Sequence, residues 1–111
     1  MELRDPSSDE LRLIRLMVSK ASKIHLPVDW EKKIQVSSFN DGEMGGILLF
    51  PDGTRAGERK FGRQASEFQF TDRDGVVVIV SLNLDQDEHL FELDVWKTDF
   101  SALIDLKFRE P

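Results

Sequence analysis

The segment "NDGEMGG", residues 40–46, combines three glycines with two carboxylates and is the first candidate for a chemical site. A phosphate-binding P-loop needs Lys and then Ser or Thr directly after its glycines, leading into a helix. Here Gly46 leads into "ILLF", which reads as a strand, and Asp41 and Glu43 would repel phosphate. We therefore interpret the segment as a turn between two strands, with a bulge at Gly45 and Gly46.

The segment "DQDEHLFELD", residues 85–94, has the acidic composition of a calcium loop. An EF-hand loop that starts at Asp85 needs Gly at its sixth position and Glu at its twelfth, and these positions hold Leu90 and Trp96. The two histidines, His25 and His89, do not form an HExxH motif. An acid–base role for His89 among its carboxylates is one interpretation, and an ordinary surface histidine is the simpler one.

Glu92 and Asp94 alternate along one predicted strand, so both carboxylates lie on the same face. Paired carboxylates carry out glycoside hydrolysis when a cleft surrounds the sugar, and an exposed acidic strand face is the alternative. No serine lies in a nucleophile-elbow context. The sequence therefore identifies no catalytic residue, and we expect no cofactor and no metal.

One acidic surface remains as a candidate for binding. Residues 85–99 hold six carboxylates against the single Lys97, which is most of the net charge of −6. Trp96 follows the same alternation as Glu92 and Asp94, and an acidic surface with an embedded aromatic side chain suits a basic protein partner. A solvated face that keeps the chain soluble is the alternative. The candidate partner-binding residues are Asp85, Asp87, Glu88, Glu92, Asp94 and Trp96.

A basic segment precedes this acidic hairpin. The stretch "TRAGERKFGR", residues 54–63, carries Arg55, Arg59, Lys60 and Arg63 against one glutamate. We expect a mobile loop that meets the acidic hairpin within the chain or across a homodimer.

Length and composition limit the possible classes of protein. The 111 residues suit one domain over 1–111, and 40% hydrophobic residues suffice for a core. The negative charge disfavours nucleic acid and anionic membranes as partners. The chain has no cysteine, which excludes disulfides and thiol chemistry. The polar start "MELRDPSSDE" shows no signal peptide, so we expect a cytoplasmic protein.

The apolar periodicity changes from helical to strand-like along the chain. Ser7 and Glu10 form a capping-box pattern before a helix whose apolar stripe is Leu11, Ile14, Val18 and Ala21, with Met17 beside it. From about residue 33 the pattern alternates, with turn signals at "FPDGT" and "DRDG". These features predict an α+β domain: an antiparallel meander of about five strands with the N-terminal helix packed on one face.

The pairing within this sheet follows from the same alternation. We expect the helix to cover a face made by Val78, Val80, Leu82, Phe91, Leu93 and Val95. After Trp96 the chain closes the fold as a short helix or an irregular segment, anchored by Phe100, Leu103 and Ile104.

Four segments in this order resemble a family of small bacterial domains of unknown function. They are "SSDELRLIRLMVSKA", "DGEMGGILLF", "ERKFGRQASEFQFTDRDGV" and "SLNLDQDEHLFELDVWKTDFSALI", of which "LFELDVWKTDF" is the most specific. The resemblance covers most of the chain and implies an α+β fold and a bacterial source. It implies no catalytic residues. Small acidic domains of this kind are similar in fold and charge to immunity proteins of bacterial toxin systems.

The sequence thus leaves three functions open. The first is a non-enzymatic protein-binding module, such as an immunity-like protein that binds a basic partner. The second is a small hydrolase or transferase that uses the acidic strand face. The third is a structural domain that associates with itself.

Overall fold

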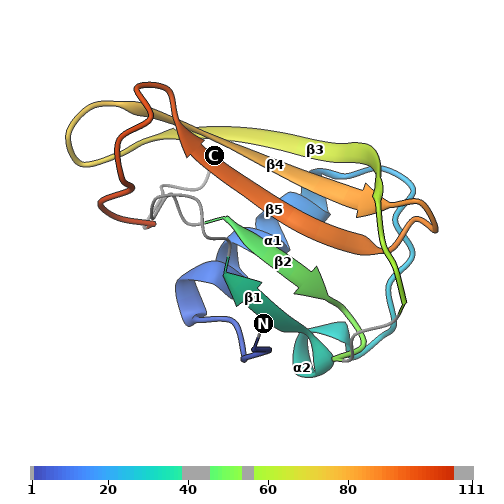
Figure 1. Ribbon diagram of the computed structural model, residues 1–111. Coiled ribbons are helices and arrows are strands. Elements are labelled where there is room, and N and C mark those ends of the chain that lie inside the picture. Colours follow the sequence, from blue (N-terminus) through green and yellow to red (C-terminus); the bar gives the residue numbers. More distant parts are fainter. Residues whose placement is uncertain (1, 39–45, 54–56, 107–111) are drawn as a thin grey trace.

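The computed structural model describes residues 2–38, 46–53 and 57–106. One antiparallel sheet holds the five strands, and α1 packs against one of its faces (Figure 1). This confirms the expected α+β class. Neither helix of these described ranges is long and apolar enough to cross a membrane. The elements are α1 (Ser8–Lys20), α2 (Trp30–Lys33), β1 (Gln35–Ser38), β2 (Ile47–Phe50), β3 (Phe61–Thr71), β4 (Val77–Asp85) and β5 (Leu90–Lys97).

The sheet departs from a simple meander at one connection. The strand order is β1-β2-β5-β4-β3, so β2 lies beside β5 and not beside β3. Ile47 pairs with Leu93, and Leu48 pairs with Glu92. After β2 the chain reaches the far edge of the sheet at β3 and returns through β4 to β5. The last strand therefore occupies the centre of the sheet, where it is hydrogen-bonded on both sides.

Helix α1 begins at the predicted capping box. The Glu10 backbone N–H donates to Ser7 Oγ at 3.1 Å, and the Ser7 N–H donates to Glu10 Oε1 at 2.8 Å. Arg4 then bonds to the same Glu10 carboxylate and to Ser38 Oγ. Glu10 thereby attaches the start of the helix to β1. Its carboxylate accepts a backbone hydrogen bond at the helix N-terminus and also binds Arg4, which lies beside the sheet.

The buried side of α1 is shifted from the predicted stripe. Leu13, Ile14 and Met17 are fully buried, whereas Leu11 and Val18 are only half-buried at the border of the core. The predicted stripe of Leu11, Ile14, Val18 and Ala21 does contact the core through its first three members, but its centre lies at Leu13, Ile14 and Met17. The sheet selects which part of a broad apolar surface faces it, and periodicity alone leaves that rotation open.

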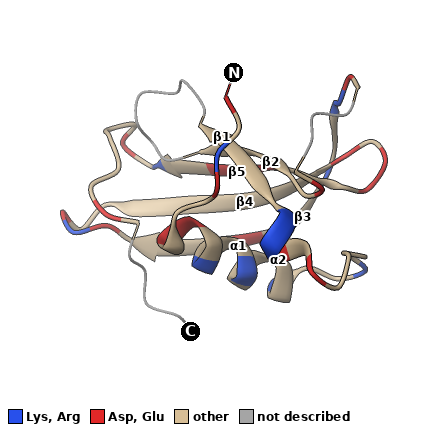
Figure 2. Cartoon of the chain, turned by 90° about the horizontal axis from the view of Figure 1, so that it is seen from below, with Lys and Arg blue, Asp and Glu red and all other residues tan. Residues whose placement is uncertain are grey.

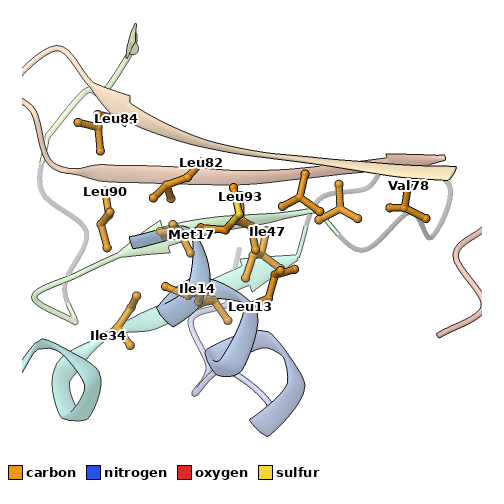
Figure 3. Close-up of a cluster of buried hydrophobic side chains, with 14 of the residues drawn as sticks. Leu13, Ile14, Met17, Ile34, Ile47, Val78, Leu82, Leu84, Leu90 and Leu93 are labelled. Carbon is orange, nitrogen blue, oxygen red and sulfur yellow. The ribbon is translucent and has the colours of Figure 1, made fainter. Parts of the chain in front are cut away.

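The face of the sheet under α1 is apolar, as expected. Figure 3 shows Val78, Leu82 and Leu93 among the side chains that meet Leu13, Ile14 and Met17 from the helix. Leu84, Leu90 and Ile47 extend the same layer of buried hydrophobic side chains. Val80 and Val95 are fully buried as well.

Phe91 does not lie on this face, which corrects the prediction. Asn83 pairs with Glu92, but the next residue, Leu84, pairs with Leu90. Phe91 is therefore an extra residue in a β-bulge. The bulge reverses the alternation at this point, so Leu90 takes the core position and Phe91 is only half-buried.

The C-terminal segment after β5 is irregular and lies at the end of the sheet that holds Asp72. Ile104 N–H and Asp105 N–H donate to the Asp72 carboxylate at 2.8 and 3.1 Å. Leu103, an expected anchor, packs half-buried against the core, and so does Leu106. Phe100 and Ile104, which the sequence analysis also expected to be anchors, are largely exposed. The segment is held more by the buried Asp72 than by its own apolar side chains.

Lys97 forms a buried ion cluster with Asp72 and Asp74. Its Nζ lies 3.0 Å from Asp72 and 2.6 Å from Asp74, and the Lys97 side chain is 1% exposed. Burial by itself lowers the pKa of Lys97, but the bonds to Asp74 and Asp72 outweigh burial and the pKa is raised. Burial likewise favours protonation of Asp72, yet the N–H groups of Ile104 and Arg73 and the Lys97 ammonium lower its pKa to about 2.

Replacing Leu93 by Ala should lower the free energy of unfolding by about 2–5 kcal/mol, because it removes a fully buried side chain at the centre of the core. The matched control is Leu48→Ala on the neighbouring strand, where a half-buried leucine should cost about 1 kcal/mol. Urea unfolding measures both. Equal losses would contradict the assignment of the core face.

Asp72 should make stability depend on pH under acidic conditions. Its pKa is lowered from 3.8 to about 2, so its contribution is fully present above pH 3.8 and is lost as the pH falls through 2. Asp72→Asn should flatten this part of the stability curve, in urea unfolding followed from pH 5 to pH 2. Identical slopes for wild type and Asp72→Asn would show that Asp72 is not the titrating group.

Candidate functional site

The six residues expected to bind a partner lie at two places in the structure. Asp85 is the last residue of β4, and Asp87 and Glu88 follow in the turn that leads to β5. The other three, Glu92, Asp94 and Trp96, follow on β5 and share the face of the sheet opposite the helices. The sequence analysis predicted a single surface from these six residues. In the structure the two groups have different surroundings.

Asp85 organises the turn. Its side chain is 2% exposed, and its Oδ1 accepts hydrogen bonds from the N–H groups of Asp87 at 2.8 Å and His89 at 3.0 Å. Glu88 adopts a left-handed φ of 66° within the same turn. A buried carboxylate that satisfies two backbone N–H groups is a structural cap. Asp87 and Glu88 are exposed.

The basic segment, residues 54–63, contacts this turn within the same chain. This is one of the two arrangements that the sequence analysis expected. Arg63 Nε lies 2.8 Å from Glu88, and Arg59 Nη1 lies 4.0 Å from Asp85. The Lys60 N–H donates to Gln86 Oε1 at 2.8 Å. Arg63 already belongs to β3, so this part of the segment is a strand and not a loop. Arg55 lies outside the described residues.

Arg59 is the best-packed cation of this region. Its guanidinium lies 4.5 Å from the Phe50 ring centre and 5.0 Å from the Phe91 ring centre, and Nη1 donates to the Leu90 carbonyl at 3.1 Å. Burial lowers the pKa of Arg59, and the nearby carboxylates of Asp85 and Asp52 oppose that effect. The bulged Phe91 thus has a function in the fold, because its ring supports the arginine.

Gly62 permits the close approach of β3 to the turn. A Cβ at this position would lie 2.2 Å from the Asp85 carbonyl oxygen, far inside contact distance. The register of β3 against β4 also shifts between Phe61 and Arg63. Sequence analysis did not single out Gly62, because a glycine between a lysine-phenylalanine pair and an arginine has no turn signature.

A pocket of about 220 Å³ opens beside the turn. Its wall comes from the α1–α2 connection, the β2–β3 connection and the β4–β5 hairpin, so no single sequence motif marks it. Both histidines of the chain line it. The lining residues are His25, Leu26, Pro27, Pro51, Asp52, Arg59, Asp85, His89 and Leu90.

The outer face is the face of the sheet opposite α1, and its acidic residues lie on β5 and on the edge strand β3. Apart from Asp85, which ends β4 and bonds within the turn, it contains three carboxylates and no lysine or arginine at the strand positions that the structure describes. The register of the five strands decides which residues of each strand lie on this face. The positions are Ser37, Leu48, Gln64, Glu67, Gln69, Thr71, Val77, Ile79, Ser81, Asn83, Glu92, Asp94 and Trp96.

Trp96 stands on the outer face beside apolar neighbours. Its ring stacks on Phe100 with centres 5.9 Å apart and planes at 19°. Ile79 is its partner across the strands, and Glu92 accepts a hydrogen bond from Asn83 Nδ2 at 2.9 Å. An aromatic pair and the carboxylates of Glu92 and Asp94 therefore share one face of the sheet.

The charges of the two sides differ. Lys97, the one cation of residues 85–99, points to the core side and is neutralised there by Asp72 and Asp74. On the helix side, blue segments mark the lysines and arginines of α1 and α2 in Figure 2. β5 instead shows a red acidic segment in the same view.

Two earlier candidates were the glycine segment and the calcium-loop pattern. The glycine segment 40–46 lies outside the described residues except for Gly46, which is buried and leads directly into β2 as expected. Within the described ranges, no group of three or more His, Asp or Glu side chains could hold a metal ion.

Comparison with known proteins places the chain in a family. The family model described as "Domain of unknown function (DUF6984)" matches residues 3–107. The chain belongs to the DUF6984 family. This confirms the resemblance to a family of small domains of unknown function. No curated protein and no solved structure matches the chain. The roles of residues in this DUF6984 domain are therefore argued from its geometry.

Two aspartates of the DUF6984 turn should respond differently to substitution. Asp85→Ala should lower the free energy of unfolding by about 1–3 kcal/mol, because two N–H groups lose their acceptor. Asp87→Ala, two residues away and exposed, should change it by no more than about 0.5 kcal/mol. Chemical denaturation of both variants tests the structural role, and similar losses would contradict it.

Proposed function

We propose that this DUF6984 domain is a non-enzymatic protein-binding module whose outer face docks a basic protein partner. The observation that carries the proposal is the charge pattern of that face. Glu67, Glu92 and Asp94 carry negative charge on this face, which they share with Trp96 stacked on Phe100. The contribution of the turn is secondary, since Asp85 and Glu88 already face Arg59 and Arg63.

The two kinds of side chain would act on different steps of binding. Negative potential accelerates the encounter with a basic protein and orients it, and this effect weakens as salt screens the charges. An aromatic side chain at the centre of an interface slows dissociation, because it buries a large area at a low cost in side-chain entropy. Trp96 is half-buried, and its neighbour Phe100 is 72% exposed, so the stack offers area to a partner.

An immunity-like protein is the specific form of this proposal. Such a protein would bind a basic toxin in the bacterial cytoplasm and block its active surface. The small acidic domain and its sequestered Lys97 support it, because the acidic face then carries no cation of its own. A toxin-like reading frame beside the gene would favour this form, and a metabolic operon would favour an enzyme.

Two other functions compete with binding. The hydrolase or transferase alternative would use Glu92 and Asp94, but neither lines the pocket, and Glu92 is held by Asn83. Self-association has one supporting observation, the basic residues of α1 and α2 on the side opposite the outer face. A homodimer or chain of copies formed in that way would dissociate in high salt, which light scattering measures.

The proposal can be tested by reversing charge on the outer face. The double variant Glu92→Lys with Asp94→Lys should lose proteins that the wild type captures from an extract of the source organism. For a captured partner, the association rate should fall at least tenfold and lose most of its dependence on salt, because the steering charge is reversed. Surface plasmon resonance at three salt concentrations measures both effects.

The matched control is Glu2→Lys with Glu58→Lys, which changes the net charge equally at exposed positions off the outer face. This control should keep the partner. Trp96→Ala should instead accelerate dissociation, at a cost of about 2 kcal/mol or more. Melting temperatures of the same variants separate binding from loss of the stack with Phe100. Unchanged kinetics in the outer-face variant would exclude that face as the interface.

A further inference from the structure

The pocket beside the β4–β5 turn contains a buried carboxylate that is only partly satisfied. Asp85 Oδ1 accepts two backbone hydrogen bonds, from Asp87 and His89. Its Oδ2 lies 4.0 Å from Arg59 Nη1 and also 4.0 Å from His89 Nδ1. Both distances are too long for a hydrogen bond, although a carboxylate accepts about four donors in total. An additional donor would therefore be favourable at Oδ2.

Oδ2 is accessible from outside. In the described part of the chain, every side-chain N or O atom that is sealed from solvent has a hydrogen-bond partner. Oδ2 has none at bonding distance, so it is not sealed, although the Asp85 side chain as a whole is 2% exposed. Since Asp85 lines the pocket, the pocket is the route by which a donor reaches this oxygen.

The charges around the pocket favour a cation over an anion. Arg59 is the guanidinium of the lining, and it is already held by the rings of Phe50 and Phe91 and by the Leu90 carbonyl. Asp85 and Asp52 both line the pocket, so its carboxylates outnumber its one guanidinium. An anion placed on Arg59 would lie beside the buried Asp85 carboxylate and be repelled by it.

The remaining wall selects the body of the ligand. Pro27, Pro51, Leu26 and Leu90 supply apolar surface, and the two prolines have restricted backbones. The volume of about 220 Å³ is smaller than that of pockets for drug-sized ligands. It suits a compact molecule with a flat or short apolar body and one polar group.

We propose that this pocket binds a small organic cation, an amidinium or ammonium compound with a compact apolar body, whose N–H groups donate to Asp85 Oδ2. Bound there, the N–H group completes the hydrogen bonds of the buried carboxylate, and the apolar body lies against the proline and leucine side chains. His25 and His89 flank the site. The inference is independent of the proposed interface, because Glu67, Glu92, Asp94 and Trp96 do not line the pocket.

The test uses the histidines as reporters, because the chain has two and both line the pocket. The full chain is titrated with benzamidine, neutral benzamide and anionic benzoate while the histidine ring signals are followed by NMR. Benzamidine should shift both histidines in a saturable manner and bind at least tenfold more tightly than the other two. No saturable shift, or tighter binding of benzoate, would overturn the proposal.

Two matched variants test the role of Asp85. Asp85→Asn keeps an oxygen for the backbone N–H groups but removes the charge, so benzamidine affinity should fall at least tenfold while benzamide affinity is unchanged. Asp87→Asn removes the same charge from the exposed side of the turn and should bind benzamidine as the wild type does. Equal affinity in both variants would overturn the assignment. If Asp85→Asn does not fold, the wild-type comparison of the three compounds decides alone.

One further variant separates this inference from the proposed function. Glu92→Lys with Asp94→Lys should bind benzamidine with wild-type affinity, because neither residue lines the pocket. A tenfold loss in that variant would show that benzamidine responds to the general charge of the domain, and the pocket proposal would fail.

Discussion

The single extra residue in the β4–β5 ladder is the constraint on which both candidate sites depend. From Glu92 onward the alternation of β5 places Glu92, Asp94 and Trp96 on the outer face and Leu93 and Val95 in the core. At Phe91 the alternation is reversed, so Leu90 enters the core in its place. The displaced ring then supports Arg59, which approaches Asp85 and the pocket. Without the bulge, Leu90 would point away from the core and the ring of Phe91 would occupy it.

The sheet is closed on one face and accessible on the other. α1 covers the apolar face with Leu13, Ile14 and Met17, and its capping box is attached to β1 through Arg4. The burial of one face supplies most of the stabilisation, because apolar area removed from water is the dominant favourable term in folding. The outer face contributes little to that core.

Charge is distributed to match this arrangement. The basic residues next to the acidic turn, Arg59 and Arg63, are engaged by Asp85 and Glu88, and Lys97 is engaged by Asp72 and Asp74. A surface ion pair contributes little to stability, but a buried one fixes the position of its partners. These three cations therefore form contacts within the domain, at both ends of the sheet. The carboxylates of the outer face lie between those ends, and the pocket lies beside one of them.

Local patterns in the sequence determined the elements and their chemistry. Ser7 and Glu10 start the helix, Gly75 turns the chain with a φ of 84°, and the alternation from Val78 to Leu84 identifies the core strand, because each depends on near neighbours. The family resemblance also rested on sequence alone. These features account for the fold class and for the acidic hairpin with its Trp96.

Tertiary structure alone decided the strand order, the rotation of α1, the bulge at Phe91 and the pocket. β2 pairs with β5 across a gap of more than forty residues, and no local pattern encodes such a distant pairing. His25, Arg59 and Asp85 come together from three distant segments, so their spacing in the sequence does not indicate that they share a pocket. The burial of Lys97 depends in the same way on Asp72 and Asp74, which lie more than twenty residues away. Periodicity reports which residues can share a face, whereas packing decides which face and which partner.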